Sequence, residues 1–222
     1  MPLPWSGELA GRLDRHVVAS ETLRGNPLGD PHERPLHVYV PPGYDDEPDR
    51  RYASIYVIQG YTGRLAMWDN RTPFRQPFYE TADQVFASGQ APPAVMVFVD
   101  ARTSYGGSQF VDSPGTGDYH SYLCHKVAPW VDAHYRTALR PEHHGITGGS
   151  SGGFGTCITP MLGPDLFGGF ARTRATRCTS TATCRSSPRW CGRCGSTTAT
   201  CRRGGPTFAA VRRSRSPPTG SC

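Results

Sequence analysis

The stretch GITGGSSGGFG at residues 145–155 decides more about the fold than any other part of the chain. It contains the pattern G-x-S-x-G centred on Ser150, with an apolar strand-type residue before it and a helix-compatible run, residues 156–162, after it. Glycines two residues before and after the serine let a strand and a helix pass close together, where a Cβ atom would clash. Such a turn lifts the serine hydroxyl clear of a sheet and aims the first helical N–H groups at whatever it attacks. The stretch therefore predicts a nucleophile elbow at Ser150, and the alternative is a flexible glycine-serine loop that fits a short pattern by chance.

Apolar segments elsewhere in the chain alternate between strand and helix patterns. Residues 36–40, 52–58 and 94–99 are short runs rich in β-branched and aromatic residues, as expected of strands. Residues 78–88 and 119–135 have helical spacing. Strands that alternate with helices imply a mainly parallel sheet covered on both faces, so the predicted fold class is α/β with flanking helices.

The candidate site is expected at the carboxyl ends of these strands, where open α/β sheets bind their ligands. Residues 59–63 follow the second strand and contain two glycines that let the backbone approach a ligand, and Asp100 follows the third strand. Ser150 falls at the same edge. The loop 102–119, rich in Gly, Ser and Pro, is expected to line the pocket together with Trp68.

Several segments share their sequence and their order with a known family. They are VYVPPGY at 38–44, YVIQGY at 56–61, GGSQF at 106–110, PWVDAHYR at 129–136, and the elbow. Together they resemble the putative-esterase branch of the α/β-hydrolase superfamily, which groups esterase D-like enzymes (S-formylglutathione hydrolases), enterochelin esterases and secreted mycolyltransferases. The similarity covers about residues 18–170. One departure is Gln59, where family members usually carry His, but a backbone oxyanion hole does not need that side chain.

The resemblance implies an α/β-hydrolase-like fold and a serine esterase or acyl hydrolase. Ser150 would attack an ester carbonyl and form an acyl-enzyme, and the backbone N–H groups of Tyr61 and Ser151 would hold the oxyanion. Ser151 is the alternative nucleophile because it also satisfies the pattern, but the glycine pair at 152–153 favours Ser150. The implied partner is a small-molecule ester or thioester, and serine acyl transfer needs no cofactor. Substrate identity, and the choice between hydrolysis and transfer, stay open.

A serine nucleophile also needs a histidine base and a carboxylate that orients it. In this superfamily both follow the serine in the chain, but no acid follows Asp165 and no histidine follows His144. His144 enters the opposite end of the elbow strand, about 20 Å from the serine, whereas proton transfer needs about 3 Å. His120 is the one earlier histidine that could face the site, and an ordinary exposed position is the simpler expectation. The chain as written is therefore expected to be inactive or weakly active, because the triad acid and histidine are absent.

Composition changes abruptly near Ala171. Residues 172–222 contain 11 of the 24 Lys and Arg residues and six of the eight cysteines but no Asp or Glu, in a chain of net charge +6. With so few large apolar residues this Arg/Cys/Thr-rich tail is expected to be disordered, and residues 1–171 to form the N-terminal part of a hydrolase domain. Back-translation in a register shifted by two bases gives protein-like sequence without stop codons, which favours a truncating frameshift after about Phe170. The C-terminal strands would then be missing, leaving an open and aggregation-prone sheet edge.

Two other functions stay open. The chain could be a non-catalytic protein that keeps the hydrolase scaffold, or the tail could bind zinc or nucleic acid through Cys191 and Cys194, flanked by Cys184 and Cys201. This spacing is not the paired C-x-x-C pattern of zinc ribbons, so neither a metal site nor a nucleic-acid partner is predicted. No segment is long and apolar enough to span a membrane, and residues 1–14 lack the apolar core of a signal peptide. The prediction is therefore a protein without a membrane partner, located in the cytoplasm.

Overall fold

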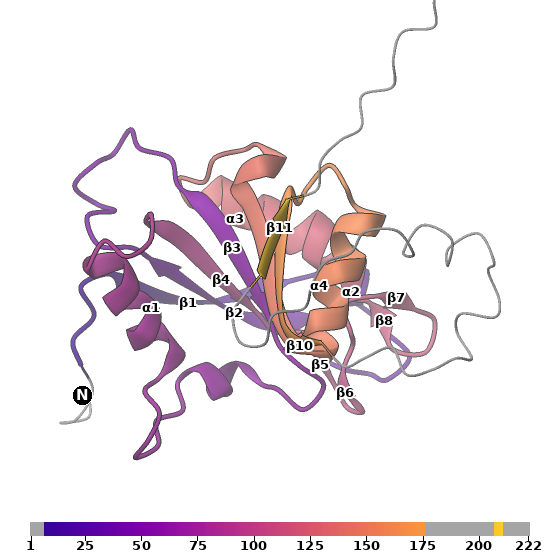
Figure 1. The fold of residues 1–222 in the computed structure, drawn as a ribbon. Helices are drawn as coiled ribbons and strands as arrows, with labels where there is room; N and C mark the ends of the chain where they lie inside the picture. The colour runs from indigo at the N-terminus through magenta and orange to yellow at the C-terminus, as the bar shows by residue number, and fades with distance from the viewer. Residues whose placement is uncertain (1–6, 176–206, 211–222) are drawn as a thin grey trace, which may run out of the picture.

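The computed structural model describes residues 7–175 and 207–210, whose strands form a seven-stranded sheet with helices on both faces (Figure 1). The strand order is β1-β2-β4-β3-β9-β10-β11. The strands are β1 (Arg12–Ala19), β2 (Glu33–Val40), β3 (Ala53–Ile58), β4 (Ala94–Val99), β9 (His144–Ser150), β10 (Gly169–Ala175) and β11 (Thr207–Ala210). The helices are α1 (Phe78–Ala87), α2 (Tyr119–Ser121), α3 (Ala128–His134) and α4 (Ser151–Leu162), with a π-helical stretch η3 (Tyr122–Val127) joining α2 to α3. Two short hairpins complete the loops, β5 (Arg102–Thr103) with β6 (Gly106–Gly107), and β7 (Asp112–Ser113) with β8 (Gly117–Asp118).

The centre of the sheet is parallel and its edges are antiparallel. Strands β4, β3, β9 and β10 run in the same direction, while β1 and β2 pair antiparallel on one side and β11 pairs antiparallel on the other. The predicted α/β class with flanking helices is therefore confirmed, as a mixed sheet with a parallel centre. Strand β1 was not predicted because its sequence, RLDRHVVA, has neither regular alternation nor a long apolar run; most of its side chains are partly or fully exposed, as expected at a sheet edge.

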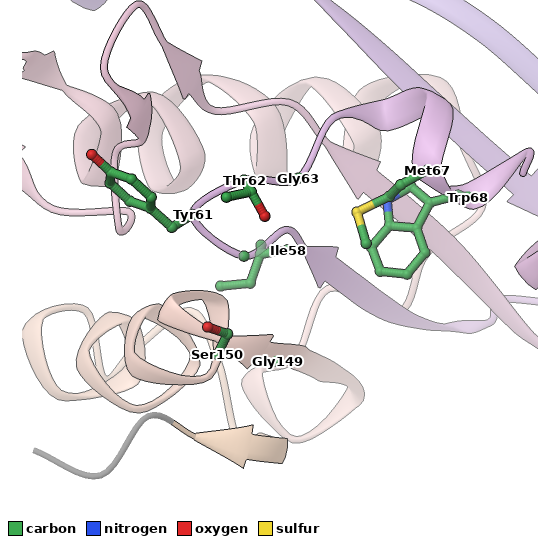
Figure 2. Close-up of a pocket in the computed structure, with 9 residues that line it drawn as sticks. Ile58, Tyr61, Thr62, Gly63, Met67, Trp68, Gly149 and Ser150 are labelled. Atoms are coloured by element: carbon green, nitrogen blue, oxygen red, sulfur yellow. The ribbon is translucent and has the colours of Figure 1, made fainter.

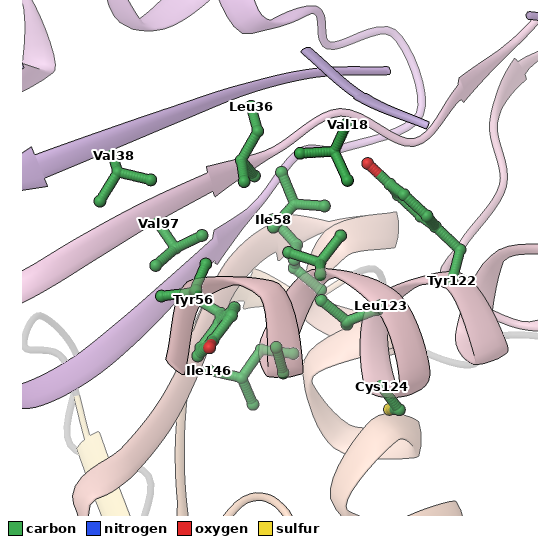
Figure 3. Close-up of a cluster of buried hydrophobic side chains, with 14 of the residues drawn as sticks. Val18, Leu36, Val38, Tyr56, Ile58, Val97, Tyr122, Leu123, Cys124 and Ile146 are labelled. Carbon is green, nitrogen blue, oxygen red and sulfur yellow. The ribbon is translucent and has the colours of Figure 1, made fainter. Parts of the chain in front are cut away.

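Side chains of the central strands alternate between two apolar cores. In β4, Val95, Val97 and Val99 point into the core beneath α2, η3 and α3, and the intervening Met96 and Phe98 point into the core beneath α1. Figure 3 shows the first core, where the helix residues Tyr122 and Leu123 meet strand residues from β2, β3, β4 and β9. Burial of both faces fixes the register of these central strands, since a one-residue slip would exchange the two sets of side chains.

Part of the tail joins the sheet. β10 continues past Ala171 to Ala175 beside β9, and β11 pairs with residues 169–172 of β10. Residues 172–175 and 207–210 thus belong to the sheet, which composition alone does not predict. The rest of the tail, including Cys184, Cys191, Cys194 and Cys201, lies outside the described residues, and the domain boundary and the frameshift stay predictions.

Candidate active site

Ser150 stands at the turn between β9 and α4. Its backbone angles are φ 58° and ψ −124°, a left-handed conformation that few residues other than glycine adopt. The strand ends at Ser150 and the helix begins at Ser151, so the chain reverses at a single residue. The Ser150 side chain is exposed, as the predicted strand–turn–helix requires.

The glycines on either side of Ser150 are required by close backbone contacts with the end of β3. A Cβ atom on Gly152 would lie 2.6 Å from the carbonyl oxygen of Gln59 and 2.8 Å from that of Ile58. A Cβ atom on Gly148 would lie 2.8 Å from the Ile58 carbonyl oxygen and 2.8 Å from the Gly152 carbonyl oxygen. Side chains at these two positions would therefore push the elbow away from β3.

The turn after β3 faces the elbow. A Cβ atom on Gly60 would lie 3.4 Å from the Cβ of Ser150, and the turn is closed by a hydrogen bond from the Gly63 N–H to the Gly60 carbonyl, 3.0 Å long. Tyr61 follows Gly60, so the structure brings this second predicted site residue beside Ser150. Parallel pairing of β3 with β9, which places Ile58 opposite Gly148, produces this proximity although about ninety residues separate the two strands in the sequence.

The hairpin β5–β6 holds Tyr61 from the other side. The Gly107 N–H donates to the Tyr61 carbonyl oxygen over 2.7 Å, and the Tyr61 hydroxyl donates to the carbonyl of Tyr105. Gly106 has φ 119°, and a Cβ atom there would lie 2.7 Å from the Tyr61 ring. The backbone of the Gly60–Tyr61 turn is thus fixed by hydrogen bonds at both ends.

A cavity of about 640 Å³ opens between the elbow and this turn (Figure 2). Its lining residues come from the end of β3, from the following turn and 3-10 helix η2 (Leu65–Trp68), and from the elbow: Ile58, Gly60, Tyr61, Thr62, Gly63, Met67, Trp68, Gly149 and Ser150. Trp68 lines it as predicted. The loop 102–119 does not, because its β5–β6 hairpin packs behind Tyr61 instead. Thr62 lies in the segment 59–63 that the sequence placed at the site, whereas Met67 was missed, since an isolated methionine carries no distinguishing pattern.

No histidine among the described residues lines this cavity. His120 lies against the far end of α4, where its Cε1 is 3.9 Å from the place that a Cβ on Gly163 would take. At 1.5 Å per residue that end is about 18 Å from Ser150. His144 is buried at the start of β9 and bonds the Ala138 carbonyl over 2.9 Å. Neither of the two histidines considered as substitutes therefore reaches Ser150.

A buried ion pair lies behind the turn. The Arg34 and Asp100 side chains approach to 2.5 Å, and both residues are less than a tenth exposed. Burial raises the pKa of Asp100, while Arg34 and the amide of Gln59 act in the opposite direction. Gln59, the departure from the family pattern, is itself 2% exposed. Its side chain faces the Asp100 carboxylate, but neither its amide nitrogen nor its amide oxygen has a hydrogen-bond partner among the described residues.

The part of the chain that the structure describes holds no group of three or more His, Cys, Asp or Glu side chains arranged to bind a metal ion. Within the same residues no helix has the length and apolar character needed to cross a bilayer.

A comparison with protein families gives a match over most of the chain. The family model described as "Putative esterase" matches residues 31–215. The chain belongs to this family. The match extends beyond the segments that carry the resemblance in the sequence and runs into the tail.

Several solved structures share the fold of this chain, although their sequence identity to it is low. A ferulic acid esterase has a TM-score of 0.58 at 21% identity, over 72% of this chain and 58% of its own. An S-formylglutathione hydrolase from Agrobacterium tumefaciens has a TM-score of 0.55 at 18% identity, over 74% of this chain and 58% of its own. The enterobactin esterase of Shigella flexneri has a TM-score of 0.51 at 19% identity, over 74% of this chain and 36% of its own. These likenesses confirm the α/β-hydrolase-like fold, and the chain spans less than two thirds of the length of each structure.

Proposed function

We propose that the chain is a serine carboxylic-ester hydrolase in which Ser150 forms an acyl-enzyme. The observation that carries the proposal is the strained backbone of Ser150, φ 58° and ψ −124°, directly opposite the Gly60–Tyr61 turn in one cavity. Strain of about 1–3 kcal/mol at a single non-glycine residue persists only where the surroundings enforce it, and such residues cluster at reactive sites. Here the glycines at 148 and 152 enforce it through contacts with β3.

The backbone N–H groups of Ser151 and Tyr61 are the proposed oxyanion donors. Ser151 is the first residue of α4, where N–H groups lack partners within the helix and the helix dipole favours negative charge. The Ser151 Oγ is buried and has no hydrogen-bond partner among the described residues, whereas Ser150 is exposed and lines the cavity. This difference favours Ser150 over Ser151 as the nucleophile.

The proposed substrate is a small-molecule ester or thioester whose acyl group contacts Met67 and Trp68, which are the large side chains on the cavity wall farthest from the elbow (Figure 2). Attack by the Ser150 oxygen on the carbonyl carbon releases the alcohol or thiol, and water then releases the acid, so no cofactor takes part. Because no described histidine lines the cavity, a general base is missing and turnover is expected to be slow.

The test measures acylation by p-nitrophenyl butyrate with and without added imidazole, which supplies the base from solution. We expect slow release of p-nitrophenol by the full chain, stimulation by imidazole beyond its own background, and a butanoyl group on Ser150 by mass spectrometry. Ser150→Ala is expected to abolish both stimulation and labelling, while Ser151→Ala retains them. A butanoyl group on Ser151 instead, or imidazole stimulation that survives Ser150→Ala, would refute the assignment.

A non-catalytic role is the second candidate, and the cavity without a histidine favours it. In that case the same cavity would bind an ester or acid without turnover. Saturable binding of butyrate esters with no butanoyl group on Ser150, even at high imidazole concentration, would support this alternative and exclude the first.

A further inference from the structure

A second cavity, of about 430 Å³, lies at the same edge of the sheet and is lined by three arginines. Arg34 enters it from the start of β2, Arg64 from the turn before η2, and Arg102 from β5. Two carboxylates, Asp30 and Asp100, also line it. No local sequence pattern indicates this group, because its three arginines are thirty or more residues apart along the chain.

The charges in this cavity do not cancel. Arg34 and Asp100 neutralise each other at 2.5 Å. The Asp30 carboxylate accepts hydrogen bonds from the N–H and the hydroxyl of Ser104. Arg64 and Arg102 form no ion pair with any described residue. One positive charge is therefore left over, which matches a monoanion better than a dianion.

The inner wall also contains an unused donor. Arg34 is 5% exposed, and its Nε has no hydrogen-bond partner among the described residues although its terminal nitrogens bond the Asp100 carboxylate and backbone carbonyls. A buried N–H without a partner is destabilising, so a ligand oxygen that accepted its hydrogen bond would remove that penalty.

The two cavities share their walls. Arg64 and Leu65 face the second cavity, and Gly63, Met67 and Trp68 in the same turn face the cavity of Ser150. On the other side, the hairpin that carries Arg102 also holds Tyr61 through the Gly107 N–H. A ligand that filled the Ser150 cavity and extended over this turn would reach the arginines.

We propose that the second cavity is a subsite for a carboxylate on the substrate, so that the preferred esters carry a monoanionic group beyond the reacting carbonyl. Guanidinium groups bind carboxylates through paired, charge-assisted hydrogen bonds, and Arg64 and Arg102 offer two such groups beside the buried Nε of Arg34. This inference rests on the proposed function for its link to catalysis, but the carboxylate site itself can be tested without turnover.

The experiment measures binding of butanoyl amides to the full-length Ser150→Ala chain by calorimetry. The probes are N-butanoyl derivatives of glycine, β-alanine and 4-aminobutyrate, each paired with its uncharged carboxamide, so that the spacer length varies while the acyl group stays constant. We expect at least one acid to bind about tenfold more tightly than its carboxamide at low ionic strength. High salt should reduce this preference, because ions screen exposed arginines.

Substitution then assigns the preference to the arginines. The double variant Arg64→Gln and Arg102→Gln should bind each acid and its carboxamide about equally, and each single variant should lose part of the preference. Arg75→Gln is the matched control, since Arg75 is an exposed arginine that lines neither cavity. A cooperative thermal unfolding transition is measured for every variant as the control for correct folding.

Equal affinity for acid and carboxamide at all three spacer lengths would overturn the proposal, as would a preference that survives the double substitution. These outcomes differ from failure of the proposed function. If Ser150 is acylated but acids bind no more tightly than carboxamides, the subsite proposal fails and the proposed function stands. If acids bind more tightly but Ser150 is never acylated, the proposed function fails and the carboxylate site stands.

Discussion

Replacing Gly152 by alanine tests whether the elbow is built directly against β3. The added Cβ atom would lie 2.6 Å from the Gln59 carbonyl oxygen, 2.8 Å from the Ile58 carbonyl oxygen and 2.9 Å from the Gln59 carbonyl carbon. All three atoms belong to the backbone at the end of a central strand, so none can rotate away as a flexible side chain would. The strand end and the helix must move apart.

Two opposing effects determine how much Gly152→Ala changes the free energy of unfolding. Overpacking of this kind costs about 1–3 kcal/mol of folding stability. Because Gly152→Ala makes three contacts with rigid backbone atoms, its overpacking cost is expected at the upper end, about 3 kcal/mol. Alanine is favoured over glycine within a helix by about 1 kcal/mol, which offsets part of that loss. The net expectation is a loss of about 2 kcal/mol in the free energy of unfolding, or about 4–8 °C in melting temperature for a chain of this length.

Gly145→Ala in β9, the strand that leads into the elbow, is the control. Its Cβ would lie 3.8 Å from the Ser54 carbonyl oxygen and 4.0 Å from that of Gly169, which are ordinary contacts. Because alanine restricts the unfolded chain, this variant should melt at the same temperature or slightly higher. Thermal unfolding followed by circular dichroism compares the two, and acylation of Ser150 is expected to fall only in Gly152→Ala. If both variants melt together, the close packing inferred between elbow and β3 is wrong.

Three further expectations concern strain, a buried carboxylate and pH. Ser150→Gly should be more stable than Ser150→Ala by about 1 kcal/mol in thermal unfolding, because both remove the hydroxyl and only glycine relieves φ 58°; equal stability would exclude backbone strain. Asp83→Ala should cost about 3 kcal/mol in urea unfolding and Tyr39→Phe about 1 kcal/mol, since the Asp83 carboxylate accepts from the Tyr39 hydroxyl and from two backbone N–H groups before β1; similar losses would contradict this. Burial lowers the pKa of His37 below its ordinary 6.5, so on acidification the unfolded chain binds the proton before the folded chain does. The free energy of unfolding should therefore fall as pH drops through and below 6.5. If a His37→Gln variant shows the same dependence of melting temperature on pH, His37 does not contribute.

The central strands and the elbow could be predicted from the sequence because each depends on a local pattern. Residues 94–99 form β4 as predicted, and the 52–58 run forms β3 apart from its first residue. Helix α1 ends one residue before the predicted Ser88. These segments are buried on both faces or on one helical face, so hydrophobic periodicity alone identifies them.

The features that sequence reasoning missed depend on contacts between distant residues. β1 lies at the sheet edge, and its longest apolar run is the three residues 17–19. The predicted helix 119–135 contains a π-helical stretch at Tyr122–Val127, which spacing of apolar residues does not distinguish from an α-helix. The ion pair of Arg34 with Asp100 joins β2 to the end of β4, and nothing in either local sequence indicates the other partner.

The G-x-S-x-G motif specifies only half of the candidate site for the same reason. The motif specifies small residues at 148 and 152, but the reason for them lies in the carbonyl groups of Ile58 and Gln59 on another strand. Those carbonyls precede Gly60, so the contacts that force Ser150 into its strained conformation also fix the position of the opposite turn. Elbow and turn therefore constrain each other through backbone atoms alone. For that reason a change at Gln59, whose side chain points toward Asp100, is compatible with an intact turn, whereas a single methyl group at Gly152 is not.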